Sequence, residues 1–163
     1  MTTATGTATA SRARKANAKG PAQYAALVVA IFLIVIGIIG FIPGIVPHLD
    51  QITFAGPFSG AFVFNVFQTS ILQNIVHIVF GLAGLGAIGR RKNATMYIAG
   101  MSFMFGVLWL YGLLFGNSDF GGNIFPFNPA DFSFNIGLSI ALGITGLATS
   151  QLALFGSDYE VDD

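Results

Sequence analysis

Six polar side chains that could do chemistry recur at helical spacing in two otherwise apolar stretches of the sequence. They are Gln73, Asn74 and His77 in the first stretch, and Asp131, Asn135 and Ser139 in the second. At 100° per residue, each set falls on one side of its helix, within an arc of roughly 100° in the first stretch and roughly 80° in the second, with Asp131 just beside it. We therefore expect the six residues to form one polar cluster between two facing helices.

Two kinds of chemistry suit such a cluster. His77 can titrate near neutral pH, with Asp131 as its candidate partner, and would then belong to a proton or ligand site. Alternatively, the amides and hydroxyls hydrogen-bond across the helix contact, each bond contributing roughly 0.6 to 2 kcal/mol. We favour the second interpretation, because polar groups inside a membrane are costly unless neighbouring helices satisfy them.

Asp131 also has a local explanation. In the run Asn128-Pro129-Ala130-Asp131, Asn128 is a suitable N-cap, Pro129 suits the first helical position, and Asp131 puts negative charge on the first turn. We therefore predict that Asn128 is the N-cap of the last helix and that Asp131 supports it. Further along the two polar faces, four glycines can let helix backbones approach closely, and we expect the faces to meet there: Gly81, Gly84, Gly143 and Gly146.

The elements that carry these residues are long apolar segments. Only 9% of the 163 residues are charged and the mean hydropathy is +0.75, both far from the values of soluble domains. We predict an all-α polytopic membrane protein, a bundle of four transmembrane helices at about 22–42, 65–89, 97–116 and 129–155. This domain, 22–156, lies between a disordered basic tail, 1–21, and an acidic tail, 157–163.

Charge segregation predicts the topology. All seven basic residues lie before the first span or between the second and third. The two predicted outer loops contain Asp50 and Asp119 but no basic residue. Because basic residues in short flanking segments mark the cytoplasmic side, we expect both termini in the cytoplasm. The outer loops are rich in phenylalanine, which predicts packing at the membrane interface or, alternatively, a surface for a partner protein.

Composition also excludes several classes of site. The chain has no cysteine and only two histidines, His48 and His77, so thiolate metal sites and thiol nucleophiles are ruled out. We find no catalytic constellation and expect no enzyme activity, no bound cofactor or metal, and no nucleic-acid partner. The expected surroundings are the lipid bilayer and either a membrane-protein partner or further copies of the chain.

The run from Gln73 to Leu85, QNIVHIVFGLAGL, followed later by Asn128–Asp131, resembles an uncharacterised family of four-span bacterial membrane proteins common in actinobacteria. That family is a domain of unknown function, and the resemblance covers roughly residues 22–155. It implies an integral protein of the bacterial plasma membrane with no assigned activity. Many members carry histidine where this chain has Gln73 and Asn135. If those histidines hold a metal or haem, His77 alone offers at most one axial ligand here.

Three functional hypotheses follow. The first is a non-enzymatic accessory or assembly subunit that packs against a larger membrane complex. The second is a small oligomeric channel or transporter that uses the polar cluster around His77. The third is a membrane-bound cofactor or redox protein that uses His77 and Asp131. We favour the first, because the chain is small, lacks a catalytic constellation and has glycine-rich helix faces.

Overall fold

The computed structural model describes residues 19–116, 118 and 123–155, with side chains described as far as 150. The described chain is helical, with one short hairpin. Its elements are α2 (Pro21–Ile39), the 3-10 turn η1 (Leu49–Gln51), β1 (Phe62–Val63), β2 (Phe67–Gln68), α3 (Ile71–Ala87), α4 (Arg91–Phe115) and α5 (Pro129–Phe155). The predicted N-terminal tail up to residue 18, the loop residue Asp119 and the predicted acidic tail lie outside the described residues.

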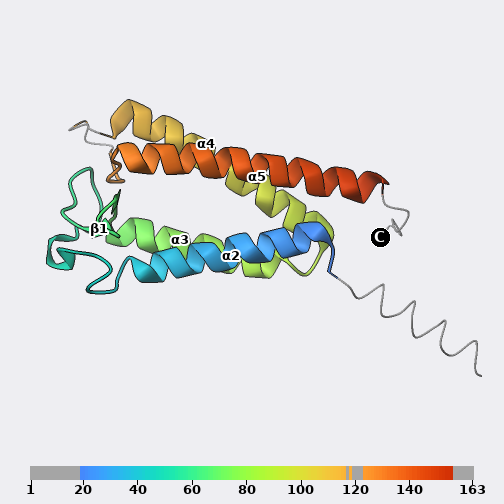
Figure 1. Cartoon of the computed structure of the whole chain (residues 1–163), viewed down its shortest axis with the longest axis horizontal. Helices are drawn as coiled ribbons and strands as arrows, with labels where there is room; N and C mark the ends of the chain where they lie inside the picture. The colour runs from blue at the N-terminus through green and yellow to red at the C-terminus, as the bar shows by residue number, and fades with distance from the viewer. Residues whose placement is uncertain (1–18, 117, 119–122, 156–163) are drawn as a thin grey trace, which may run out of the picture.

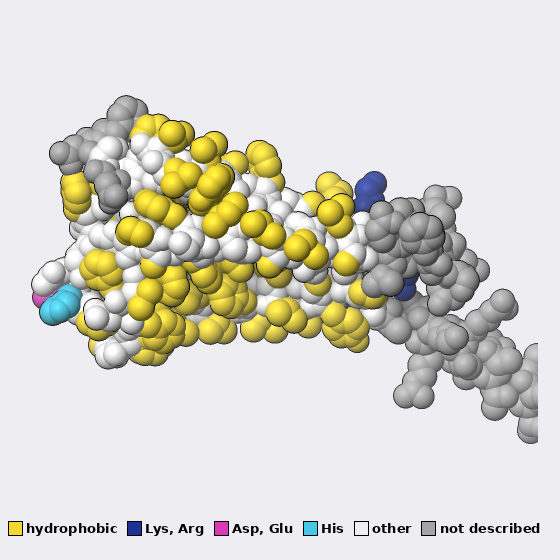
Figure 2. All heavy atoms as spheres, turned by 45° about the horizontal axis from the view of Figure 1, so that its top comes forward, with side chains coloured by type: hydrophobic (Ala, Val, Ile, Leu, Met, Phe, Trp, Pro, Cys, Tyr) yellow, Lys and Arg dark blue, Asp and Glu magenta, His cyan; other side chains and the backbone are white. Residues whose placement is uncertain are grey.

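Three of the described helices are long and apolar enough to cross a membrane: Pro21–Ile39, Arg91–Phe115 and Pro129–Ser150. The remaining helix, α3, is apolar but has only 17 residues, which at 1.5 Å per residue gives a length of about 26 Å. Hydrophobic side chains are spread along the visible surface between the two ends of the molecule, and the charged side chains that can be seen lie at those ends (Figure 2). Length and composition therefore indicate a membrane location.

The four helices form two packed pairs (Figure 1). α2 packs along α3, and α4 packs along α5, while smaller contacts of α2 with α4 and α5 join the pairs. The two polar faces were expected to meet directly, yet α3 and α5 share no extended contact. Small residues of α3 lie against α2 and α4 instead, and those of α5 lie against α4.

The main core lies where α2 meets α4 and α5. Ala26 and Ala30 of α2 are completely buried, and Leu33, one turn further along, is 1% exposed. Ile98 and Phe105 of α4 are almost completely buried as well. Small side chains on α2 let the larger side chains of α4 fill the space between the helices, so van der Waals packing holds the two pairs together.

Two predicted spans have different bounds. The segment predicted as 65–89 becomes helical only at Ile71, because Ser70 has an extended conformation and its hydroxyl accepts a hydrogen bond of 3.2 Å from Gln73 N. Before it, Phe64 and Asn65 adopt positive φ values in the turn between β1 and β2. The segment predicted as 97–116 is helical from Arg91. Hydropathy marks where apolar residues begin, whereas a helix can extend further through exposed charged residues.

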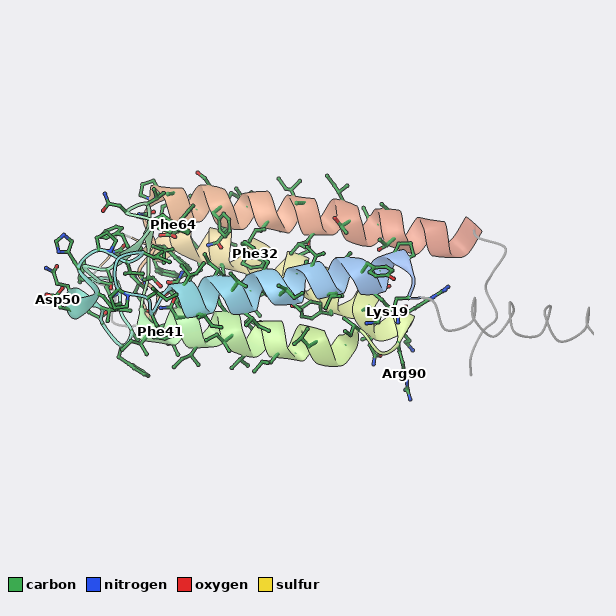
Figure 3. All side chains as sticks on the ribbon, turned by 60° about the horizontal axis from the view of Figure 1, so that its bottom comes forward. Lys19, Phe32, Phe41, Asp50, Phe64 and Arg90 are labelled. Atoms are coloured by element: carbon green, nitrogen blue, oxygen red, sulfur yellow. The ribbon has the colours of Figure 1, made fainter. Side chains whose placement is uncertain are left out.

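Residues 40–70, which we call the cap, close one end of the helices. Val46, Ala61 and Val63 form a small buried cluster in the cap, and Ile36 and Ile39 of α2 pack against it. Figure 3 shows Phe41, Asp50 and Phe64 at this end and Lys19 and Arg90 at the opposite end. Acidic and basic residues of the described chain are therefore separated by the length of the helices.

Candidate functional site

A small cavity lies between α3, α4 and α5 and is the candidate site. Its volume is about 20 Å³. Three of the predicted cluster residues line it, Gln73 and His77 from α3 and Asn135 from α5. Apolar and thioether side chains complete the wall: Val76, Phe80, Met101, Met104, Phe105, Leu108, Phe125 and Phe127. Although α3 and α5 are not packed together, their polar faces thus open onto one space.

The three polar side chains of the cavity have no hydrogen-bond partner among the described residues. The carboxamide oxygen of Gln73 is buried and accepts no hydrogen bond. Asn135 is only 5% exposed, and neither its amide nor the His77 ring makes a hydrogen bond within the described chain. Buried polar groups are normally paired, so a site where several unpaired groups converge is a candidate binding site.

Asn74, by contrast, points towards the end of α2 and is hydrogen-bonded there. Its Nδ2 donates to Gly40 O at 2.9 Å, and its Oδ1 accepts from Thr69 Oγ1 at 2.6 Å. A Cβ atom at Gly40 would collide with the Asn74 side chain. Asn74 therefore joins the end of α2 to the start of α3 and does not line the cavity.

Asp131 holds the cap onto α5. Its Oδ2 accepts hydrogen bonds from Gln68 N at 3.2 Å and Asn128 N at 2.9 Å. Asn128 Oδ1 accepts in return from Asp131 N at 3.0 Å, and Asn128 Nδ2 donates to Val66 O at 2.7 Å. The reciprocal bonds of Asn128 and Asp131 have the geometry of a capping box. Asp131 is therefore engaged by backbone groups and does not line the cavity with His77.

Ser139 pairs with α4. Its hydroxyl donates to Ser102 O at 2.8 Å, and the Ser102 hydroxyl donates to Ser139 O at 2.8 Å. Ser102 was not identified from the sequence, although Ser102-x-x-x-Gly106 repeats the spacing of Ser139-x-x-x-Gly143 and could have revealed it. The cavity residues Met101 and Met104 gave no such signal, because apolar side chains of a span point to lipid and to protein alike.

The four predicted packing glycines lie at helix contacts within and between the pairs. A Cβ at Gly81 would lie 2.7 Å from Ala30 O of α2, and one at Gly84 would lie 2.5 Å from the Tyr97 ring of α4. On α5, a Cβ at Gly143 would lie 3.2 Å from Ser102 Oγ, and one at Gly146 would lie 3.5 Å from Ile98. The glycines of α3 thus face α2 and α4, and those of α5 face α4, instead of facing each other.

Comparisons with known proteins identify the family. No curated protein and no solved structure matches the chain. The family model of a domain of unknown function, DUF4383, matches residues 23–148. This range contains almost all of the four helices and every residue that lines the cavity. Because the match covers most of the sequence, the chain belongs to the DUF4383 family.

Proposed function

We propose that the protein crosses the plasma membrane of a bacterium four times, with both termini in the cytoplasm. The length of α3, 17 residues, is at the lower limit for a transmembrane helix. Lys19, Arg90, Arg91 and Lys92 lie before α2 and around the connection from α3 to α4, and Lys19 and Arg90 mark the same end in Figure 3. Basic residues at that end support its placement in the cytoplasm.

Reporter fusions test this topology. Alkaline phosphatase, which is active only outside the cytoplasm, is expected to be active when fused after Asp50 in the cap and inactive when fused after Gly89 or at the C-terminus. A fluorescent protein that folds only in the cytoplasm is expected to show the opposite pattern. Active phosphatase at the C-terminus would indicate an odd number of spans and contradict the proposal.

Within that membrane, the protein is proposed to act as a non-enzymatic accessory or assembly subunit of a larger membrane complex. The observation that carries this proposal is the exposure of aromatic rings on the cap: Phe54 is 65% exposed, Phe58 64% and Phe64 56%. The cap, which lies at one end of the helices (Figure 3), also carries the exposed polar residues His48 and Asp50. Several exposed large apolar side chains in one segment are a feature of protein contact surfaces.

The test is to extract a tagged copy from its own membrane in a mild detergent and analyse it by native gel and mass spectrometry. An accessory subunit is expected to migrate with a large complex whose subunits are identified in the same band. The double variant Phe54→Ala and Phe58→Ala is expected to leave that complex. A matched control, Phe103→Ala and Leu114→Ala, changes equally exposed side chains of α4 and is expected to remain bound. Migration of the wild type alone would contradict the accessory role.

The cavity favours a second candidate function, a small oligomeric channel or transporter. Unpaired polar groups around His77 are the kind of feature that lines a solute or proton route. Purified protein in lipid vesicles should then show proton or solute flux that His77→Gln reduces while the protein remains folded. Vesicles without flux over the whole accessible pH range would remove this candidate.

A further inference from the structure

One buried carboxamide oxygen of the cavity, Gln73 Oε1, has no hydrogen-bond partner among the described residues, and this favours a bound molecule that can donate to it. Gln73, His77 and Asn135 reach the same space from two helices, and within the described chain their side chains form no hydrogen bonds. The neighbouring polar residues Asn74 and Ser139 are, in contrast, paired at 2.6 to 2.9 Å. Because an unpaired buried polar group destabilises a protein strongly, the buried Gln73 Oε1 beside the unbonded side chains of His77 and Asn135 points to a bound molecule.

The volume restricts the size of that molecule. A space of about 20 Å³ exceeds the roughly 10 to 15 Å³ that one water molecule needs, whereas organic ligands occupy pockets of several hundred Å³. A water molecule also needs two to four polar partners, and this cavity supplies three side chains. Size and number of partners therefore both match a single water.

The lack of charged side chains among the described lining residues further restricts which molecule can bind. Among the residues that the structure describes, no Asp, Glu, Lys or Arg lines the cavity, and the Asp131 carboxylate is bonded to the backbone N–H groups of Gln68 and Asn128 instead. An ion would thus lie in an apolar region without a counter-charge, which is unfavourable. The one ionic rival is a soft monovalent metal such as Cu(I), because Met101, Met104 and His77 offer two thioethers and an imidazole.

We propose that this cavity is a binding site for one water molecule, which hydrogen-bonds to Gln73, His77 and Asn135 and so couples α3 to α5. α3 and α5 share no extended contact, so the water supplies a polar link between these two helices, in addition to the bond that Tyr97 Oη of α4 donates to Phe80 O of α3 at 3.1 Å. It also gives His77 a hydrogen-bond partner inside the protein. The site does not depend on the proposed accessory role, because every contributing residue belongs to this chain.

Infrared spectroscopy of the full-length protein in lipid nanodiscs tests the proposal directly. A single buried water gives a sharp O–H stretching band that moves to lower frequency when H₂¹⁶O is replaced by H₂¹⁸O. We expect this band in the wild type and its loss in the double variant Gln73→Met and Asn135→Leu. The matched control Met104→Leu changes another residue of the same wall and should keep the band. A wild-type spectrum without a sharp ¹⁸O-sensitive O–H band, distinct from the broad absorption of bulk water, would overturn the proposal.

The melting temperature Tm gives an independent test, because a dry cavity and a hydrated cavity predict Tm changes of opposite sign for the variant Gln73→Met. If the cavity is dry, Gln73→Met removes an unpaired polar group and should raise Tm. If a water is bound, the same change removes one of its partners and should lower Tm. Gln73→Met and Asn135→Leu should then be non-additive although they lie on different helices, since the water couples them. A raised Tm or strict additivity would contradict the water site.

Titration with Ag(I), a probe for Cu(I) sites, distinguishes the water site from a soft-metal site in the same cavity. The water site predicts that Ag(I) changes neither the Tm nor the ¹⁸O-sensitive band of the wild type. Binding of one Ag(I) per chain that disappears in Met101→Leu with Met104→Leu would overturn the proposal in favour of a soft-metal site.

Discussion

Ser102 of α4 and Ser139 of α5 exchange two hydrogen bonds, each hydroxyl donating to the other residue's backbone carbonyl at 2.8 Å. Small residues flank the exchange, because a Cβ at Gly106 would lie 3.1 Å from Ser139 Oγ and one at Gly143 would lie 3.2 Å from Ser102 Oγ. The two helices therefore approach closely enough for side chains to reach the opposite backbone. Two Ser-x-x-x-Gly motifs that face each other are thus the polar centre of the α4–α5 pair.

Removing either hydroxyl of this exchange should destabilise the protein modestly. Ser102→Ala and Ser139→Ala are each expected to lower the free energy of unfolding by about 0.6 to 1.7 kcal/mol, the range for interhelical hydrogen bonds in membranes. Unfolding by sodium dodecyl sulfate in mixed micelles measures the change. Ser133→Ala is the control, because Ser133 Oγ bonds only to Pro129 O of its own helix, and it should change little. An equal effect of all three variants would show that the exchange adds nothing beyond a local bond.

Two glycines of α3, Gly81 in a close helix contact and Gly86 in open space, allow a matched comparison of alanine substitutions. Gly81→Ala would place a Cβ 2.5 Å from the Ile34 side chain and 2.7 Å from Ala30 O, and should lower the free energy of unfolding by about 1 to 3 kcal/mol. Gly86→Ala meets nothing within 4 Å and should be neutral or stabilising by up to about 1 kcal/mol, because alanine favours helix. The same denaturation experiment distinguishes them, and a stable Gly81→Ala variant would contradict the close α2–α3 contact.

Asn74 should be required for the junction of α2, α3 and the cap. Asn74→Leu leaves Gly40 O and the Thr69 hydroxyl without their partner and should cost about 1 to 3 kcal/mol for the unpaired groups. Adding Thr69→Val removes one of these unpaired groups, so the double variant should be less destabilised than the sum of the single changes. Asn93→Ala, at an exposed position of α4, serves as the control with little change. Strict additivity of Asn74→Leu and Thr69→Val would argue against their bond.

Asp131 should tolerate asparagine better than alanine. Both backbone N–H groups that Asp131 binds reach the same oxygen, Oδ2, and an amide oxygen can occupy that position. Asp131→Ala is therefore expected to cost about 1 to 3 kcal/mol and to speed hydrogen exchange at the Gln68 amide, whereas Asp131→Asn should keep that amide protected. Asp50→Ala, at an exposed position, is the control. Rapid exchange at Gln68 in both Asp131 variants would show that the negative charge itself is needed.

Much of the local structure could be read from the sequence. The capping run Asn128–Asp131 indicated the start of α5, because a cap depends on hydrogen bonds between residues three positions apart. The start of α3 at Ile71 was predicted six residues too early. There the apolar residues continue through the β1–β2 hairpin, and hydropathy does not distinguish a strand from a helix.

The candidate site was only partly predictable for a different reason. Helical periodicity placed six polar residues on two faces, and the structure brings Gln73, His77 and Asn135 to one cavity. Asn74, Asp131 and Ser139 have partners in α2, the cap and α4 instead. Those partners, among them Gly40, Gln68 and Ser102, lie up to 63 residues away in the chain, and periodicity within one helix carries no information about them.

The sequence by itself thus determined the helical class, the membrane location and the separation of charges along the chain, since these depend on local composition and transfer free energies. Only the tertiary structure decided which helix each polar or glycine-lined face meets. The sequence does not indicate which helix Gly81 packs against. In the structure, Gly81 packs closely against Ala30 and Ile34 of α2. Packing between helices depends on the fit of two surfaces at once, and that fit exists only when the chain is folded.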